Sequence, residues 1–106
     1  MPNEKPETEA TEPSLPDVGE TIPPIDFTTF VLSLSTSVLM NLGLVPGPDG
    51  SRVEPSLPMA RQTIDLISLL QEKTRGNLTG AEEQILGQIL FDLRMRFIEK
   101  AGRPSR

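Results

Sequence analysis

The segment Phe27-Thr-Thr-Phe-Val-Leu-Ser-Leu-Ser-Thr-Ser-Val-Leu-Met-Asn-Leu-Gly-Leu44 belongs to the longest uncharged run of the chain. Its bulky apolar residues recur at helical spacing and share one stripe: Phe27, Phe30, Val31, Leu34, Val38 and Leu42. Serine and threonine fill much of the remaining circumference, where a solvent-exposed helix would carry charges. Asp26 stands at the N-cap position. The sequence therefore predicts a helix over about residues 26–43 that is buried on more than one side.

A membrane span is the alternative interpretation of this segment, because its length nearly matches a bilayer core of roughly 30 Å at about 1.5 Å per residue. Its hydroxyl and amide side chains lower the hydropathy, and no Lys or Arg flanks either end. The segment also lies behind an acidic stretch, which does not fit a signal peptide. We expect a helix buried in protein, and any membrane association to be peripheral.

Residues 1–24 differ in composition from the rest, with six acidic residues, one lysine and six prolines. Their net charge of −5 equals that of the whole chain, so the remainder is balanced. Such a segment has little apolar surface to bury. We expect it to form a disordered acidic tail.

A second helix is predicted over about residues 58–75. The preceding loop contains a turn at Pro48-Asp49-Gly50. Pro58 suits the first turn of a helix, with Ser56 or Leu57 as its cap. Gly76 follows the last helical turn and is suited to stop it.

A third helix is predicted over about residues 80–101, because Thr79-Gly-Ala-Glu82 has the pattern of a capping box. One stripe of this helix is apolar: Leu86, Ile89, Leu90, Leu93 and Phe97. A second apolar set, nearly opposite, consists of Phe91, Met95 and Ile98. Residues 102–106 then form a short basic tail. The predicted fold is all-α, a small three-helix module of antiparallel helices over residues 25–101.

A helical module of about 80 residues has a marginal core, and two of its helices have more apolar surface than one face can bury. We therefore expect the core to be completed by homo-oligomerisation. The predicted interface consists of these residues: Phe27, Phe30, Val31, Leu34, Val38, Phe91, Met95 and Ile98.

The chain contains neither cysteine nor histidine. It therefore cannot form a disulfide, a thiolate or imidazole metal site, or a nucleophilic triad that needs either residue. The carboxylates of the helical part fit caps and polar faces and show no metal-binding spacing. We expect no catalytic site, cofactor or metal, and we expect a cytoplasmic protein because cysteine-free sequences suit a reducing compartment.

A local excess of positive charge lies near the C-terminus. The predicted patch comprises Arg94, Arg96, Lys100 and Arg103. With Arg106, and against Asp92 and Glu99, it amounts to +3. This charge could attract RNA or an acidic protein. The alternative is a solvated helix edge with an Asp92–Arg96 pair, and no aromatic residues are interleaved for base stacking.

Five blocks of the sequence resemble domain-of-unknown-function family 1844, from Ile25 to about Glu99. They are Ile25-Asp-Phe-Thr-Thr-Phe-Val-Leu-Ser-Leu34, Val38-Leu-Met-Asn-Leu-Gly43, Ala60-Arg-Gln-Thr-Ile-Asp-Leu66, Lys73-Thr-Arg-Gly-Asn-Leu-Thr79 and Leu90-Phe-Asp-Leu-Arg-Met-Arg-Phe97. The resemblance implies a short, helical, cytoplasmic bacterial protein and supplies no catalytic residues.

Three functional hypotheses follow from the sequence. The first is a non-enzymatic helical interaction or adaptor protein that acts as a homo-oligomer, with a further protein partner that the sequence does not identify. The second is a small regulator that binds RNA or a ribonucleoprotein through the basic patch. The third is a peripheral membrane-associated protein that uses the first helix.

Overall fold

The computed structural model describes residues 13–19, 22 and 24–102. This part of the chain contains three helices and no strands: α2 (Phe27–Asn41), α3 (Leu57–Lys73) and α4 (Gly80–Ala101). The all-α prediction is confirmed, and the first two helices end two residues before their predicted ends. Most of the predicted acidic tail, and residues 103–106, lie outside the described residues.

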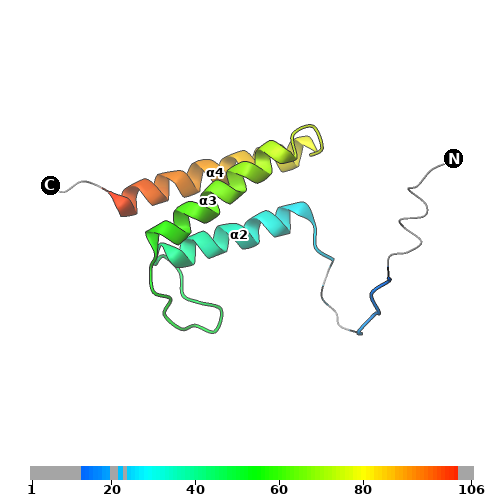
Figure 1. The fold of residues 1–106 in the computed structure, drawn as a ribbon, viewed down its shortest axis with the longest axis horizontal. Coiled ribbons are helices and arrows are strands. Elements are labelled where there is room, and N and C mark those ends of the chain that lie inside the picture. The colour runs from blue at the N-terminus through cyan, green and yellow to red at the C-terminus, as the bar shows by residue number, and fades with distance from the viewer. Residues whose placement is uncertain (1–12, 20–21, 23, 103–106) are drawn as a thin grey trace.

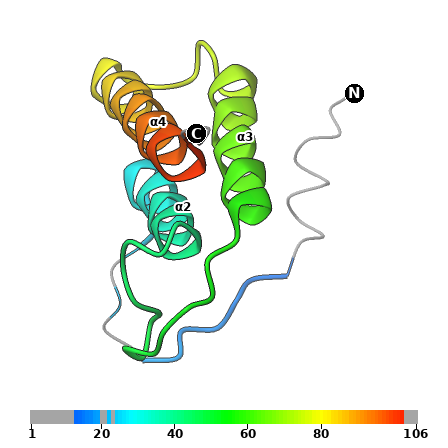
Figure 2. The ribbon, with the colours of Figure 1, turned by 90° about the vertical axis from the view of Figure 1, so that its left-hand side faces the viewer.

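The three helices pack against one another in every pairwise combination. In Figure 1, α2 and α4 run from right to left, whereas α3 runs from left to right. Viewed from the left-hand end of the bundle, the helices occupy the corners of a triangle (Figure 2). Such an arrangement lets each helix turn one stripe of side chains toward a common centre.

Hydrogen bonds cap both ends of α2, from a side chain at its start and from the backbone at its end. The Asp26 carboxylate accepts a hydrogen bond from the Thr29 amide at 2.8 Å, as its predicted N-cap role requires. At the other end Gly43 has a φ of 77°, which glycine adopts without steric cost. Its amide donates to the Met40 carbonyl at 3.0 Å, and the Leu44 amide donates to Leu39 at 2.9 Å. These two bonds form a Schellman motif that ends the helix.

The loop between α2 and α3 contains the predicted turn. The Gly50 amide donates to the Gly47 carbonyl at 2.9 Å, and the Ser51 amide donates to the Asp49 carboxylate at 3.1 Å. A further bond from the Ser56 amide to the Asn41 carbonyl, at 2.7 Å, joins the two ends of the loop. The start of α3 is thereby held beside the end of α2.

The caps of α3 and α4 follow their predicted patterns. Ser56 is the N-cap of α3, and its hydroxyl accepts from the Met59 amide at 3.3 Å. At α4, the Thr79 hydroxyl accepts from the Glu82 amide at 3.1 Å, while the Glu82 carboxylate accepts from the Thr79 amide at 2.9 Å. This reciprocal pair confirms the capping box.

The core takes contributions from all three helices. Its buried apolar residues are Val31, Val38, Leu42, Ala60, Ile64, Ile67, Leu86, Leu90 and Leu93. The sets on α3 and α4 each follow the spacing i, i+4, i+7, so a single stripe of each helix enters the core. Burial of one of the larger side chains of this set contributes about 1.5–3 kcal/mol.

Candidate interaction surface

The outer face of α4 carries three large apolar side chains that the core does not use. Phe91 is 68% exposed, Met95 44% and Ile98 60%. Their spacing of four and then three residues places them on one face of the helix. We call these three residues the outer stripe. Contiguous exposed apolar residues of this size are characteristic of interaction surfaces.

The predicted interface residues on α2 have a different environment. Val31 and Val38 are fully buried in the core of their own chain. They therefore do not belong to a surface that a second chain could cover, which corrects their predicted place in the interface. Phe27 and Leu34 are half-buried and pack against the same core, and Phe30 lies at its exposed edge. The buried part of the α2 stripe packs against α3 and α4 of the same chain.

Two of the six hydroxyl groups of α2 bond within the helix. The Ser33 hydroxyl donates to the Thr29 carbonyl, and the Thr36 hydroxyl donates to the Leu32 carbonyl, both at 3.0 Å. Back-bonding of this kind satisfies a hydroxyl without a tertiary partner. These two hydroxyls therefore need no second molecule to satisfy their donors.

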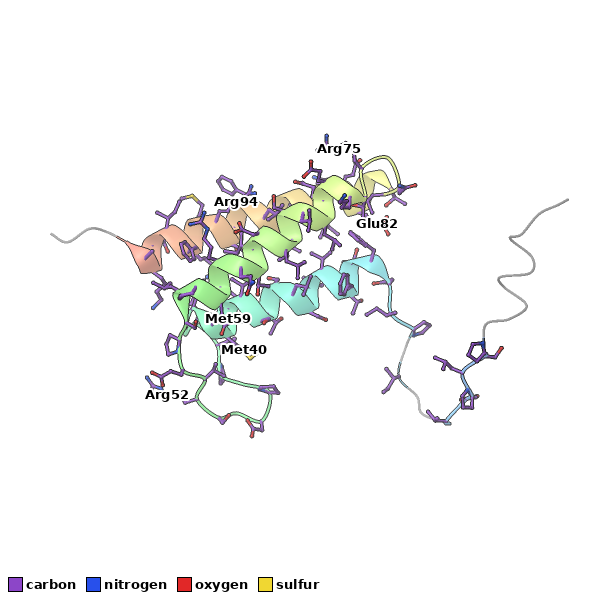
Figure 3. The ribbon with its side chains drawn as sticks, viewed as in Figure 1. Met40, Arg52, Met59, Arg75, Glu82 and Arg94 are labelled. Carbon is purple, nitrogen blue, oxygen red and sulfur yellow. The ribbon has the colours of Figure 1, made fainter. Side chains whose placement is uncertain are left out.

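Two arginines of the predicted basic patch have partners inside the chain. The Arg96 guanidinium lies 2.8 Å from the Asp92 carboxylate, one helical turn away. Arg94, which is labelled in Figure 3, donates to the Ser68 hydroxyl at 3.2 Å and so connects α4 to α3. Lys100 is exposed in the last turn of α4, and Arg103 lies outside the described residues. Within the described part of this patch, the Asp92 carboxylate offsets the charge of Arg96.

A groove of about 350 Å³ runs between α3 and α4, beside the outer stripe. Its lining residues are Arg61, Ile64, Asp65, Arg94, Phe97 and Ile98. We call it the α3–α4 groove. Its floor is apolar and its charged residues are two arginines and one aspartate. Arg61 and Asp65 lie 3.7 Å apart with both side chains well exposed, so their pairing is weak and leaves both accessible.

Sequence reasoning did not find this groove. Arg61 and Asp65 are recognisable as members of the polar arc of α3, and Ile64 and Phe97 as core-facing residues. Their convergence with Arg94 depends on the register of α4 against α3. No local pattern encodes that register.

Two other hollows are open and contain few functional groups. One of about 390 Å³ lies in the loop after α2, lined mainly by proline, glycine and aliphatic residues together with Arg52. Another of about 290 Å³ lies near the turn between α3 and α4, with Arg75 and Glu83 in its lining. In the described ranges, no three residues among Asp, Glu, His and Cys lie close enough to hold a metal ion. Neither hollow has an arrangement typical of catalysis.

Two carboxylates have perturbed acidity, and both have structural causes. Hydrogen bonding from the Thr29 backbone lowers the pKa of Asp26 from its usual 3.8. Hydrogen bonding from the side chain and backbone of Ser51 likewise lowers the pKa of Asp49. Donors favour the ionised carboxylate at a helix cap and at a turn. These shifts therefore reflect local structure and do not indicate a proton-transfer site.

Over the described ranges, none of the helices combines the length and the hydropathy needed to cross a bilayer.

A protein-family model described as "Domain of unknown function (DUF1844)" matches residues 24–99. The chain belongs to this family. The match covers α2, α3 and nearly all of α4, so it includes the outer stripe and the α3–α4 groove, and it confirms the resemblance seen in the sequence. No curated protein and no solved structure matches the chain. The family's description names no activity, so inference about function depends on the geometry of these surfaces.

Proposed function

We propose that the chain is a non-enzymatic helical interaction protein that assembles with a second copy of itself through the outer stripe. The observation that supports this function is the exposure of Phe91, Met95 and Ile98 on a helix whose other face is fully packed. The core of each chain is complete without these residues, so the stripe is available to another molecule. Burial of this apolar surface would drive association.

The arrangement of the outer stripe suits a two-fold pairing of α4 with α4. When two α4 helices cross in opposite directions at the level of residues 94 and 95, Phe91 of one lies opposite Ile98 of the other. Met95 then lies near its own counterpart, and its flexible thioether side chain can fill an irregular contact. A two-fold interface uses the same patch on both chains, which this symmetric spacing allows.

A charge placed in the outer stripe should dissociate the assembly without unfolding the chain. The test compares Ile98→Asp with Leu69→Asp, which introduces the same charge at an apolar residue of α3 with similar exposure. Light scattering after gel filtration should give a dimer mass for the unmodified chain and for Leu69→Asp, and a monomer mass for Ile98→Asp. Circular dichroism should show equal helix content in all three proteins.

Two results would contradict this function. One is a monomer mass for the unmodified chain at concentrations up to hundreds of micromolar. The other is a dimer that Ile98→Asp leaves intact, which would locate assembly elsewhere. Repeating the measurement at high salt adds a second criterion, because apolar contact persists when charge attraction is screened.

A non-enzymatic and cytoplasmic protein accords with the absence of histidine and cysteine from the sequence. The carboxylates with lowered pKa serve as cap and turn residues, as described above. No specific observation favours RNA binding, since the Asp92 carboxylate pairs with Arg96 and offsets its charge. A membrane-associated function through α2 gains no support either, because Val31, Val38 and Leu42 of its stripe are buried in the core and Phe30 is its one exposed member.

A further inference from the structure

The segment before α2 carries the most exposed large apolar side chains of the described residues. Leu15, Val18, Ile22 and Ile25 are each between 70% and 90% exposed. They are interspersed with Asp17 and Glu20 in a part of the sequence whose net charge is −5. Apolar residues alternating with acidic ones form a ligand-like pattern, because such a segment gains by contacting an apolar surface with basic edges.

One local hydrogen bond forms a turn in this segment. The Gly19 amide donates to Asp17 Oδ1 at 2.9 Å, and Gly19 has a φ of 75°. In the sequence, Leu15 and Val18 flank Asp17. The second carboxylate oxygen of Asp17, Oδ2, takes no part in this bond.

The α3–α4 groove has the complementary chemistry. Ile64, Phe97 and Ile98 supply apolar contact, while Arg61 and Arg94 exceed Asp65 by one positive charge. At about 350 Å³ the groove lies at the small end of the range for ligand sites, roughly 300–1,000 Å³. It is large enough for an aliphatic side chain and an adjoining carboxylate.

We propose that the segment Leu15–Val18 of a second copy of this chain lies in the α3–α4 groove. An aliphatic side chain of the segment contacts Ile64 and Phe97, and the Asp17 carboxylate lies between Arg61 and Arg94. This inference rests on the proposed self-association and adds a contact to it. The acidic segment of each chain thereby contributes to the site on the other.

The reach of the segment favours a second copy over the same chain. Phe27 follows Asp17 by ten residues, a span of at most about 36 Å. Figure 3 places Met59, near the start of α3, at one end of the bundle, and Arg75 and Glu82 at the other end, where α2 begins. The groove is formed by the early turns of α3 and the late turns of α4. The chain's own segment would have to run back along α2, about 22 Å, and also around the bundle.

The test uses a nitroxide spin label. Because the chain contains no cysteine, an introduced cysteine is the single site of attachment. Full-length Ser14→Cys carries a nitroxide and is mixed, in large excess, with an isotope-labelled full-length chain that has no nitroxide, so that most isotope-labelled chains pair with a nitroxide-bearing one. Methyl signals of Ile64 and Ile98 in the isotope-labelled chain should lose at least about half of their intensity, whereas the Ile25 methyl signals should change less. A nitroxide at Ser51→Cys, on the loop between α2 and α3, is the matched control and should leave Ile64 and Ile98 unaffected.

Charge reversal gives the inference a second, independent test. Nitroxide-induced loss of signal intensity is called broadening below. Arg94→Glu in the isotope-labelled chain should reduce the broadening of the Ile64 methyl signals at least about threefold. Asp17→Arg in the nitroxide-labelled chain should restore it when combined with Arg94→Glu. Both changes are at exposed residues, so neither is expected to disturb the core.

Failure of this inference is distinguishable from failure of the proposed function. A light-scattering dimer without broadening at Ile64 and Ile98 would overturn the groove contact and leave self-association through the outer stripe intact. A monomer without broadening would overturn both. A further sample, in which one chain carries both the nitroxide and the isotope label and is diluted with unlabelled chain, tests the chain's own segment as occupant. Broadening in that sample but not in the mixed one would overturn the second copy as occupant and assign the groove to the chain's own segment. Broadening that Arg94→Glu does not alter would overturn the Asp17 contact.

Discussion

In the sequence, the stripe of α2 and the outer stripe of α4 look equally apolar. In the structure, most of the α2 stripe faces the core, whereas the outer stripe of α4 faces solvent. Val31 and Val38 of α2 are buried by the other two helices, whereas Phe91 and Ile98 of α4 remain exposed. The cause is geometric: in a bundle of three helices each helix turns one stripe inward. α2 has one main stripe, and α4 has two. Apolar periodicity therefore predicts that a helix face will be buried, but not whether the same chain or another one buries it.

The most direct test of this difference in burial is to place the same charge on each stripe. Val38→Asp buries an unpaired carboxylate, which costs several kcal/mol against a total stability of about 5 kcal/mol for a small domain. We expect this variant to be unfolded by circular dichroism at 25 °C. Phe91→Asp should keep its helix content and lose only the dimer mass in light scattering.

The two outcomes could also be reversed. A folded Val38→Asp would mean that α2 can leave the bundle without loss of the other helices. An unfolded Phe91→Asp would mean that the chain has no stable monomer, so that the outer stripe is part of the folding unit. Urea unfolding of the unmodified chain at several protein concentrations separates these cases, because an obligate dimer becomes more stable as its concentration rises.

The helix caps allow a smaller and more local comparison. The capping box satisfies two otherwise free amides at the start of α4. Thr79→Ala removes the hydroxyl that accepts from the Glu82 amide and should reduce the free energy of unfolding by about 1 kcal/mol. Thr79→Ser, the matched control, keeps the hydroxyl and should change stability by a few tenths of a kcal/mol at most. Urea unfolding measures both, and equal losses in the two variants would contradict the assigned cap.

Much of this fold can be predicted from local sequence. Asp26, Gly43 and the Thr79–Glu82 pair specify helix ends through bonds that span a few residues, and the structure contains those bonds. The core positions of α3 and α4 also follow from periodicity. The end of α3 was placed two residues too far, because the helix stops at Lys73 before the positive-φ residue Gly76. The Thr74 hydroxyl donates to the Leu70 carbonyl at 2.8 Å, so a side chain completes the last turn there.

The candidate site was harder to predict than the fold. The outer stripe is visible as a second periodic set on α4, since periodicity is a property of one helix. The α3–α4 groove requires the depth and register of one helix against another, which side-chain packing determines. The pairing of Arg94 with Ser68 crosses 26 residues of sequence. No spacing rule within one helix could have indicated that bond.

The smallest predicted effect is a dependence of stability on acidic pH. The N-cap of α2 is Asp26, whereas the N-cap of α4 is Thr79, which does not titrate. The pKa of Asp26 is lowered in the folded chain by the Thr29 donor, so its ionised form favours the folded state. This contribution is complete well above the usual pKa of 3.8 and is lost as the pH falls through 3.8 toward the lower pKa of the folded state. Asp49 acts in the same direction.

Asp26→Asn keeps a capping oxygen but removes the charge, so it provides a matched comparison for this acid effect. Thermal melts should show the unmodified chain as the more stable of the two above about pH 5. Their midpoints should converge as the pH falls below 3.8. A difference that stays constant from pH 7 to about pH 2.5 would mean that the cap acts through the shape of the carboxylate and not through its charge, since only the charge is titrated in this range.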